Sequence, residues 1–353
     1  MKKIAALMMA ALMSVTFMTG CKGDSGKINE KGYFSKLNVY NWGDYIDPEV
    51  LKGFEDEYGI KVNYEEYSTN EEMLAKIQAG GTSYDVIFPS EYMIESMAKQ
   101  KLLQEVDYAN VDNFKNIGEQ YKNHAYDPNN KFSVPYAWGT MGIVYNKTKV
   151  KEPVDSWNVL WNSKYKGQIL MIDSPRDTIG ITLKKLGYSL NTKNPDELKK
   201  AEEELMKQKA LVKSYEVDTY KDQMIAEEAS MSLAWSMDAM LLIRENPNLA
   251  YAIPKEGTNL WFDSMAIPVT SKHKKEAELF INYMLRPEVA MKNAEYIKIS
   301  TPNVEAMKLL PEEVRTNKYL YPDGDVFKNG EVFTDLGEFT KEYDRMWTEI
   351  KSY

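Results

Sequence analysis

The segment LNVYNWGDYIDP (residues 37–48) decides the fold, because a strand, a turn and the start of a helix follow one another within it. Apolar and polar residues alternate at its beginning, as they do in a half-buried strand. Asp47 and Pro48 are residue types of a helix N-cap and of a first helical position. A loop that only turned the chain would need Gly43 and Asp44, but not the two large aromatic residues that flank them. The segment therefore predicts a strand-to-helix turn with a further task.

Strand and helix patterns continue to alternate after this segment. Thr69 and Glu72 have the spacing of a capping box, and Gly59 stands where a helix would end. The expected elements are a strand over 37–42, a helix over 47–59, a strand over 60–67, a helix over 69–81, a strand over 84–90 and a helix over 90–100. A β-α-β-α-β order requires parallel strands with crossover connections, so the fold class is α/β.

The second half of the chain repeats this order with different sequences. Expected strands cover 167–173, 229–235, 248–254 and 259–268, and expected helices cover 175–189, 236–246 and 271–296, the last one interrupted at Pro287. The strand over 259–268 is expected to run between two lobes. The length of the chain allows two domains of ordinary size, each with its own core.

Polar and aromatic residues gather where these strands end. Ligands of open parallel sheets bind in the crevice beyond the carboxyl ends of the strands. Five separate segments place aromatic rings, carboxylates or hydroxyls there. The candidate ligand-binding residues are Trp42, Gly43, Asp44, Tyr45, Ser90, Tyr92, Asp177, Trp235, Asp238, Trp261 and Asp263.

Aromatic rings together with carboxylates suit a slender organic cation with an alkyl body. An ammonium over an aromatic ring gains about 0.5–2 kcal/mol, and each buried methylene contributes roughly 0.8 kcal/mol. A buried ammonium also needs a carboxylate, because an unpaired buried charge costs several kcal/mol. These requirements together describe a polyamine.

Each candidate also fits a purely structural role. Any of the tryptophans fits core packing, and Arg176 fits as the partner of the neighbouring carboxylates. Turn formation, helix capping, a helix N-terminus or a surface ion pair would account for the polar candidates, which are Asp44, Ser90, Asp177, Asp238 and Asp263. The functional interpretation depends on the whole set rather than on one member.

Eight collinear segments connect the chain with a known family. They are VYNWGDYI (39–46), YDVIFPSEY (84–92), YDPNNKFSVPYAWGTMGIVYN (126–146), WNSKYKGQILMIDSPRD (161–177), LKKLGYSLNT (183–192), PKEGTNLWFDSMAIP (254–268), FINYMLRPEVA (280–290) and STPN (300–303). Over nearly its whole length without the N-terminal leader, the chain resembles the bacterial polyamine-binding proteins of ABC importers, the spermidine/putrescine group.

The resemblance implies a two-lobed, type II periplasmic-binding-protein-like fold that closes on ligand in the cleft between the lobes. The expected division is 36–139 plus 264–310 for lobe 1 and 140–263 plus 311–353 for lobe 2. Hinges are expected near residues 138–140, 262–264 and 309–311. The implied partners are a polyamine and a membrane permease with its ATPase, and the implied state is a monomer.

The resemblance also implies roles for the candidates. Aromatic walls of the amine site would come from Trp42 and Tyr45, with Ser90 and Tyr92 opposite them. Trp235 and Trp261 would enclose the alkyl chain. The carboxylates that would hold ammoniums are Asp44, Asp177, Asp238 and Asp263, of which Asp44 and Asp238 match putrescine-preferring members.

Three positions depart from the pattern of the spermidine-binding members. Ser174 replaces an aspartate, Ile299 a tyrosine and Phe333 a glutamine, so these three residues are candidate contacts at a ligand end. The loss of polar partners at one end argues against a plain copy of spermidine recognition. Asp44 and Asp238 favour putrescine, whereas Trp261 is the choice of spermidine binders. The prediction is putrescine with spermidine tolerated.

The N-terminus predicts export and lipidation. A basic start is followed by an apolar run over 4–18 and by MTGC, which resembles the lipobox of bacterial lipoproteins. Residues 1–20 would then be a lipoprotein signal peptide, Cys21 the lipidated residue and 21–35 a flexible tether. An ordinary secretory signal with a chance cysteine remains the alternative. The protein would be exported and anchored by its lipid to the outer face of the cytoplasmic membrane, or on the periplasmic side in a Gram-negative bacterium.

Several other classes fit the sequence less well. Without Lys2 and Lys3 the formal charge of −9 becomes −11, which makes nucleic acid a poor partner. Enzymatic activity is not expected, because no catalytic motif is present and His124 and His273 are expected at the surface. No metal site and no cofactor are expected. Open alternatives are an iron-, sugar- or other cation-binding lipoprotein, and a lipoprotein that presents ligand to a sensor.

Overall fold

The computed structural model describes residues 27–80, 83–322 and 324–352. The predicted signal peptide and Cys21 lie outside the described residues. Strands are β1 (Lys36–Trp42), β2 (Lys61–Tyr67), β3 (Val86–Ile87), β4 (Ser133–Asn146), β5 (Ile169–Ile172), β6 (Val212–Glu216), β7 (Met231–Trp235), β8 (Leu249–Ala252) and β9 (Leu260–Ala266). Helices are α1 (Pro48–Tyr58), α2 (Asn70–Ala79), α3 (Glu91–Lys99), α4 (Pro175–Lys185), α5 (Pro195–Lys209), α6 (Tyr220–Ile225), α7 (Ser236–Glu245), α8 (Lys274–Met284), α9 (Pro287–Ile297), α10 (Val304–Leu309), α11 (Glu312–Arg315), α12 (Gly324–Asn329) and α13 (Thr340–Ser352).

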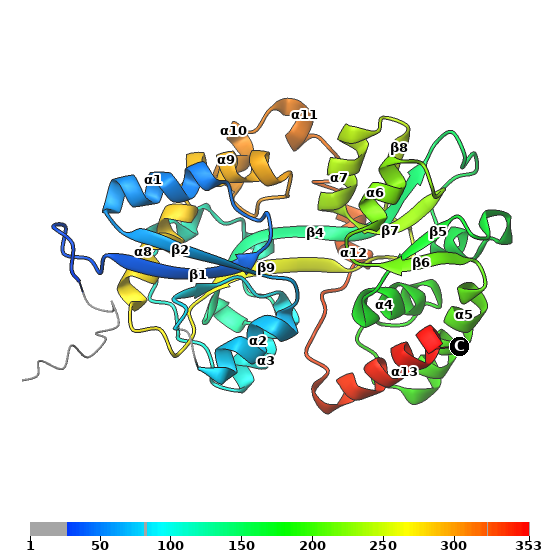
Figure 1. The fold of residues 1–353 in the computed structure, drawn as a ribbon, viewed down its shortest axis with the longest axis horizontal. Helices are drawn as coiled ribbons and strands as arrows, with labels where there is room; N and C mark the ends of the chain where they lie inside the picture. Colours follow the sequence, from blue (N-terminus) through cyan, green and yellow to red (C-terminus); the bar gives the residue numbers. More distant parts are fainter. Residues whose placement is uncertain (1–26, 81–82, 323, 353) are drawn as a thin grey trace, which may run out of the picture.

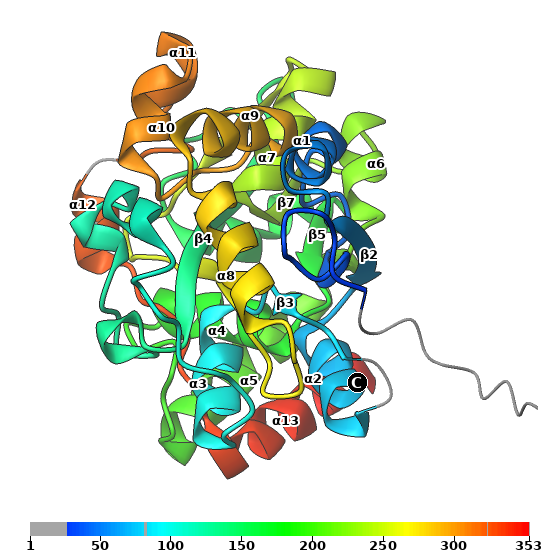
Figure 2. The ribbon, with the colours of Figure 1, turned by 90° about the vertical axis from the view of Figure 1, so that its left-hand side faces the viewer.

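One mixed sheet runs through the described chain in the order β2-β1-β3-β9-β4-β7-β5-β6, with β8 paired to β4. The pairs β1–β2 and β1–β3 are parallel, as predicted from the β-α-β-α-β pattern. β5 also lies parallel to both β6 and β7. Helices cover both faces of this sheet, with α1, α9 and α7 on one face and α2, α3, α4 and α13 on the other (Figure 1; Figure 2).

The long strand β4 joins the two halves of the sheet. Residues 133–140 pair antiparallel with β9, whereas residues 141–146 pair with β7 and β8. β4 and β9 therefore form a two-stranded ribbon in the middle of the molecule (Figure 1). The predicted strand over 259–268 is this β9, and it lies where a connection between lobes was expected.

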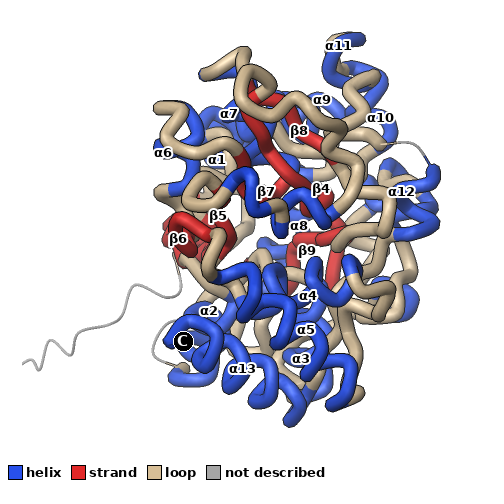
Figure 3. Tube along the Cα trace, turned by 90° about the vertical axis from the view of Figure 1, so that its right-hand side faces the viewer, coloured by secondary structure: helices blue, strands red, loops and turns tan. Residues whose placement is uncertain are grey.

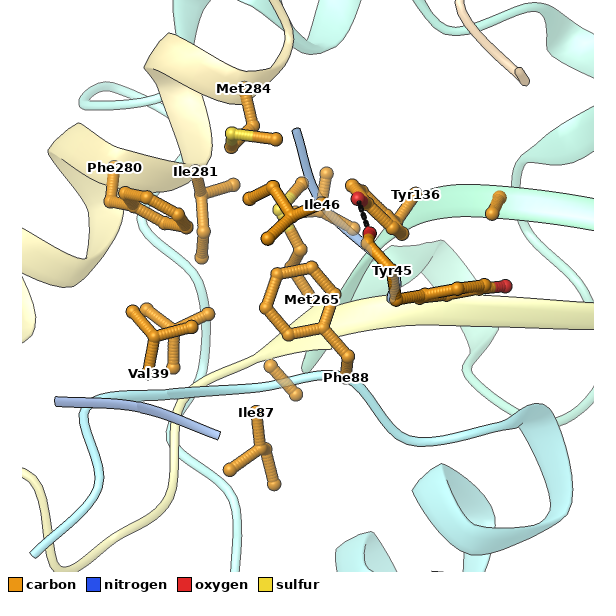
Figure 4. Packing of buried hydrophobic residues seen from close by; sticks show 14 of the residues in the cluster. Val39, Tyr45, Ile46, Ile87, Phe88, Tyr136, Met265, Phe280, Ile281 and Met284 are labelled. Atoms are coloured by element: carbon orange, nitrogen blue, oxygen red, sulfur yellow. Dashed lines mark hydrogen bonds between the residues drawn. The ribbon is translucent and has the colours of Figure 1, made fainter. Parts of the chain in front are cut away.

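Buried apolar residues divide into separate cores on the two sides of the ribbon. One cluster draws on residues 37–138 and 260–299, and three smaller clusters draw on residues 141–350. We call the elements around the first cluster lobe 1 and those around the other three lobe 2. In lobe 1, Val39, Ile87 and Phe88 pack toward Phe280 and Ile281 of α8 (Figure 4).

Helix ends follow the predicted capping residues. Asp47 accepts a hydrogen bond from the Glu49 N–H at 2.8 Å, and Thr69 accepts one from the Glu72 N–H at 3.1 Å. Pro287 starts a new helix, α9, as predicted. Such caps satisfy N–H groups that have no partner inside the helix.

Several predictions about secondary structure and exposure were wrong or incomplete. The third predicted strand, over 84–90, has only two strand residues, those of β3. The chain then continues into Pro89, which has no N–H to donate to a neighbouring strand. The predicted flexible tether is wrong for residues 27–35, because Ile28 bridges Phe34 and Asn29 donates to the carbonyl of Tyr58. The sequence reasoning also missed β6, α5 and α13, which lie together at the far end of lobe 2 (Figure 3).

The two histidines are less exposed than predicted. The ring of His124 packs on Phe262, with the ring centroids 4.5 Å apart. Nδ1 of His273 lies 3.3 Å from the carboxylate of Asp85, which is fully buried. Both histidines thus have structural surroundings outside the candidate residues.

Candidate ligand-binding site

The candidates lie at strand ends, at helix starts and on the ribbon. Trp42 ends β1 and leads into the loop 43–45, and Trp235 ends β7. First turns of helices carry Tyr92 (α3), Asp177 (α4) and Asp238 (α7), and Ser90 is the N-cap of α3. Trp261 and Asp263 belong to β9. The crossing strand thus brings two candidates between the two lobes.

Asp263 is the centre of a hydrogen-bond network in lobe 1. Its carboxylate accepts from the Tyr45 hydroxyl at 2.6 Å and from the Ser90 hydroxyl at 2.7 Å. Asn70 extends the network, because its Nδ2 donates to Ser90 Oγ at 3.1 Å and to the Tyr92 hydroxyl oxygen at 3.0 Å. The structure therefore brings together Tyr45, Ser90, Tyr92 and Asp263, as the sequence predicted.

The Asp263 carboxylate has no cationic partner in the described part of the chain. Asp263 is only 7% exposed to solvent. Burial raises the pKa of Asp263 to about 6, although the hydrogen bonds from Tyr45 and Ser90 oppose this shift. Two hydroxyl donors only partly replace the water that such a carboxylate loses. A cation placed next to Asp263 would compensate its charge.

A second carboxylate, Glu91, lies behind Asp263 and was missed by the sequence reasoning. It is fully buried and accepts a hydrogen bond from the Phe262 N–H at 2.9 Å. Burial raises the pKa of Glu91 to about 8. Its position directly after a helix N-cap marks only a favourable helix start, so no sequence signal pointed to this role.

Asp177 is the corresponding carboxylate of lobe 2. It lies in the first turn of α4, where its N–H donates to Ser174 Oγ at 3.3 Å, so Ser174 acts as the helix cap. Burial raises the pKa of Asp177 to about 6. The hydrogen bonds from Ser174 and Trp235 and the charge of Arg176 act in the opposite direction and lower it. No ion pair of Asp177 is found among the residues that the structure describes. Asp177 and Trp235 thus form one candidate unit.

Asp238 differs from these carboxylates because it has a partner in its own lobe. It is 4% exposed, accepts a hydrogen bond from the Tyr220 hydroxyl and lies 3.9 Å from Nζ of Lys221. Asp44 is exposed in the β1–α1 loop with a positive φ of 53°. Burial lowers the pKa of Lys221, but the charges of Asp238 and Asp218, and to a smaller extent that of Asp44, raise it above its ordinary value. The sequence reasoning did not single out Lys221.

The tryptophans have defined surroundings. Trp42 donates its indole N–H to the Phe88 carbonyl at 2.8 Å and packs on Tyr67. Trp261 lies against Gly139 of β4, where an added Cβ would stand 2.3 Å from Cζ2 of the indole. Glycine is therefore required at 139 for this ring position. Trp42, Trp235 and Trp261 all remain partly exposed, as rings that face a ligand must be.

Arg176 connects the two lobes at one end of the candidate site. Its guanidinium lies 4.4 Å from the ring centroid of Phe333 and 5.7 Å from that of Tyr92, and it donates to the Thr334 carbonyl at 3.1 Å. Tyr92 and Phe333 thus contact a cation that belongs to the protein. Nearby, Lys99 of α3 forms an ion pair with Asp335 at 3.1 Å.

Ile299 lies apart from the other candidates. It is 3% exposed and lines a small internal cavity of lobe 1 with Pro135 and Tyr136. Phe333 is also buried, at 4% exposure, beneath Arg176. The structure therefore groups neither Ile299 nor Phe333 with the carboxylates as an exposed ligand contact.

A comparison with known proteins identifies the family. The sequence profile of the bacterial extracellular solute-binding proteins matches residues 49–319. The chain belongs to this family. This solute-binding protein is 38% identical to the spermidine/putrescine-binding periplasmic protein of Escherichia coli K12 over 318 residues. The matched region covers 90% of this chain and 91% of the relative. It is 32% identical over 339 residues to the putrescine-binding periplasmic protein PotF of the same organism, with 90% and 91% covered.

Solved structures support the same family. The structure described as the spermidine/putrescine ABC transporter substrate-binding protein PotD from Streptococcus pneumoniae has 44% identity and a TM-score of 0.84, and covers 90% of this chain and 99% of that one. One described as a putative spermidine/putrescine ABC transporter from Listeria monocytogenes has 42% identity and a TM-score of 0.85, with the same coverage. The predicted two-lobed α/β fold is confirmed by these neighbours.

Membership in the family bears on the remaining predictions. A solute-binding role agrees with the prediction that the chain is not an enzyme, and the family is extracellular, in agreement with predicted export. Within residues 27–80, 83–322 and 324–352, no helix is long and apolar enough to cross a membrane. The same residues contain no cluster of three or more side chains suited to a metal ion.

Proposed function

We propose that this solute-binding protein captures polyamines, putrescine and/or spermidine, and delivers them to the permease of an ABC importer. The observation that carries the proposal is Asp263, a buried carboxylate that receives two hydroxyl hydrogen bonds and has no cationic partner among the described residues. An ammonium group would provide the missing charge. The names of the two relatives in Escherichia coli, a spermidine/putrescine-binding and a putrescine-binding protein, support the same ligand class.

The proposed binding mode uses both lobes. Asp263 and Asp177 each hold one ammonium, while Trp42, Trp235 and Trp261 stack on the alkyl chain. Asp44 and Asp238 lie at one end of the site, with Gly43, Tyr45, Ser90 and Tyr92 along lobe 1 and Ser174 in lobe 2. Closure excludes water, and a lower local dielectric strengthens each charge pair. The closed form then docks on the permease.

The division into lobes and the hinges stay part of this proposal. We place lobe 1 at 36–139 plus 264–310 and lobe 2 at 140–263 plus 311–353. The antiparallel ribbon of β4 and β9 supports hinges near residues 138–140 and 262–264, because only these two strands of the sheet pair along that stretch. A third hinge is placed near residues 309–311.

Isothermal titration of residues 22–353 with putrescine, cadaverine, spermidine and spermine tests the proposal. The protein is first unfolded and refolded to remove carried-over ligand. We expect one-to-one binding of at least one of the four amines. Absence of binding with all four would overturn the polyamine assignment and favour another small organic cation or a ligand-presenting role.

Substitution of Gly139 tests the aromatic wall. Gly139→Ala is expected to push the Trp261 indole out of place and to weaken binding of the tightest amine about tenfold, since one stacking contact is worth about 1.4 kcal/mol. Gly53→Ala is the matched control, because its Cβ would meet only the Tyr283 hydroxyl. An unchanged dissociation constant in Gly139→Ala would remove Trp261 from the site.

The proposal includes a lipid anchor at Cys21 and a monomeric binding protein. The support is the sequence alone, with its apolar leader followed directly by the single cysteine of the chain. Cys21→Ser is expected to abolish incorporation of radiolabelled palmitate and to release the protein from the membrane fraction. Equal labelling of Cys21→Ser and of the unchanged chain would contradict lipidation at this residue.

A further inference from the structure

Lys221 of α6 lies among carboxylates at one end of the candidate site. Its Nζ is 3.2 Å from Asp218 and 3.9 Å from Asp238, and its side chain is 34% exposed. Asp238 is a nearly buried residue of lobe 2. Lys221 is thus the resident cation next to Asp238, one of the two carboxylates that the family resemblance linked to putrescine.

This arrangement divides the carboxylates of the site into two classes. Asp238 already has the Tyr220 hydroxyl and the Lys221 ammonium as partners. Asp263 has two hydroxyl donors but no ion pair within the described chain. Asp177 likewise forms no ion pair there, and the charge of the neighbouring Arg176 only partly offsets the effect of its burial. A buried carboxylate that already has its cation gains little from a second one, whereas an uncompensated one gains a full charge pair.

A second resident cation limits the site at another position. The Arg176 guanidinium lies 4.4 Å from the ring centroid of the buried Phe333 and 5.7 Å from that of Tyr92, so it places a positive charge beside a candidate ring of the site. A ligand with more than two ammoniums would therefore bring like charges close to Lys221 or Arg176. Like-charge contacts are a common means of rejecting a wrong ligand.

We propose that Lys221 is a specificity-determining residue: its ammonium occupies the position next to Asp238 and thereby selects diamines over longer polyamines. The inference depends on the proposed function and defines its ligand class. In this arrangement the two ammoniums of a diamine pair with Asp177 and Asp263. A triamine has to displace Lys221 or leave its third ammonium outside the site.

The test is titration of Lys221→Met with putrescine and with spermidine. Methionine keeps much of the length of the side chain but removes its charge. We expect the ratio of spermidine affinity to putrescine affinity to rise at least tenfold over that of the unchanged protein. Lys213→Met is the matched control, because Lys213 forms a surface ion pair with Glu228 in the same lobe at 2.9 Å. That control is expected to keep the original ratio.

The outcomes separate this inference from the proposed function. A ratio in Lys221→Met that stays within threefold of the unchanged protein, or that falls, overturns the role of Lys221 while polyamine binding itself stands. Loss of binding by every protein, including the unchanged one, overturns both. Lys221→Gln, which keeps a hydrogen-bond donor for Asp238, serves as a second variant if Lys221→Met does not fold. It is expected to shift the ratio in the same direction.

Discussion

Asp263→Asn is expected to weaken binding of the tightest polyamine by about 2–5 kcal/mol, or about 30- to 5,000-fold in Kd. Asparagine has nearly the shape of aspartate and can still bond the hydroxyls of Tyr45 and Ser90, but it carries no charge. The ammonium that pairs with Asp263 in the proposed complex would then be buried without a counter-charge. Isothermal titration of the variant and of the unchanged protein measures the difference.

Two controls separate this loss from misfolding. Asp155→Asn removes a carboxylate from an exposed ion pair with Lys255 and is expected to leave Kd unchanged. Without ligand, Asp263→Asn is expected to be at least as stable to heat as the unchanged protein at pH 7.5. The reason is that burial raises the pKa of Asp263, so its ionised form destabilises the empty fold. A Kd within threefold of the unchanged protein would remove Asp263 from the site.

Binding is also expected to weaken about 10- to 100-fold between pH 7.5 and pH 5. Burial raises the pKa values of both Asp177 and Asp263 to about 6, so each carboxylate takes up a proton as the pH falls through that value. Amines with pKa values near that of lysine keep their charge over this range. At one pH unit below its pKa, protonation of each carboxylate lowers the affinity for the amine about tenfold, because the carboxylate must lose its proton before it pairs with an ammonium.

Titration over this pH range in two buffers of different ionisation heat measures both Kd and the protons released. The pH dependence of Asp263→Asn is expected to fall to that of one remaining group. The empty protein is expected to behave in the opposite way. Both pKa values are raised by folding, so these two carboxylates favour the folded state most when they are protonated, below about pH 4. This contribution to the free energy of unfolding is lost as the pH rises through 6. A Kd that does not change between pH 5 and 7.5 would contradict a site built on these two carboxylates.

Local sequence signals account for much of the fold. Asp47, Thr69 and Pro287 predicted helix starts because their side chains act on neighbouring backbone groups, and the alternation of apolar residues predicted β1 and β2. The segment β3 was overestimated, since its length depends on pairing with β1 and β9 rather than on its own residues. The helix α13 was missed. Its buried residues pack on α4 and α5, which lie more than 100 residues earlier in the sequence.

In the candidate site, too, local sequence signals predicted some residues, whereas residues whose roles depend on long-range contacts were missed. Strand ends pointed to Tyr45 and Ser90, and the predicted crossing strand pointed to Asp263, whose carboxylate accepts hydrogen bonds from both. Glu91 and Lys221 were missed because their roles depend on partners that are separated from them along the sequence but close in space: the Phe262 backbone for Glu91, and Asp238 for Lys221. Ile299 was a candidate because of the family resemblance, but its burial follows from the packing of lobe 1.

The position of Asp263 on β9 has a mechanical consequence. Asp263 pairs in register with Ala137 of β4, so it belongs to the ribbon about which the lobes would rotate. A point close to a pivot moves little, whereas the tips of the lobes, on long lever arms, sweep through a large arc. An amine that docks first at Asp263 would therefore keep its anchor fixed throughout closure. A small bend of the ribbon, transmitted along both lever arms, would then become a large displacement at the surface that meets the permease.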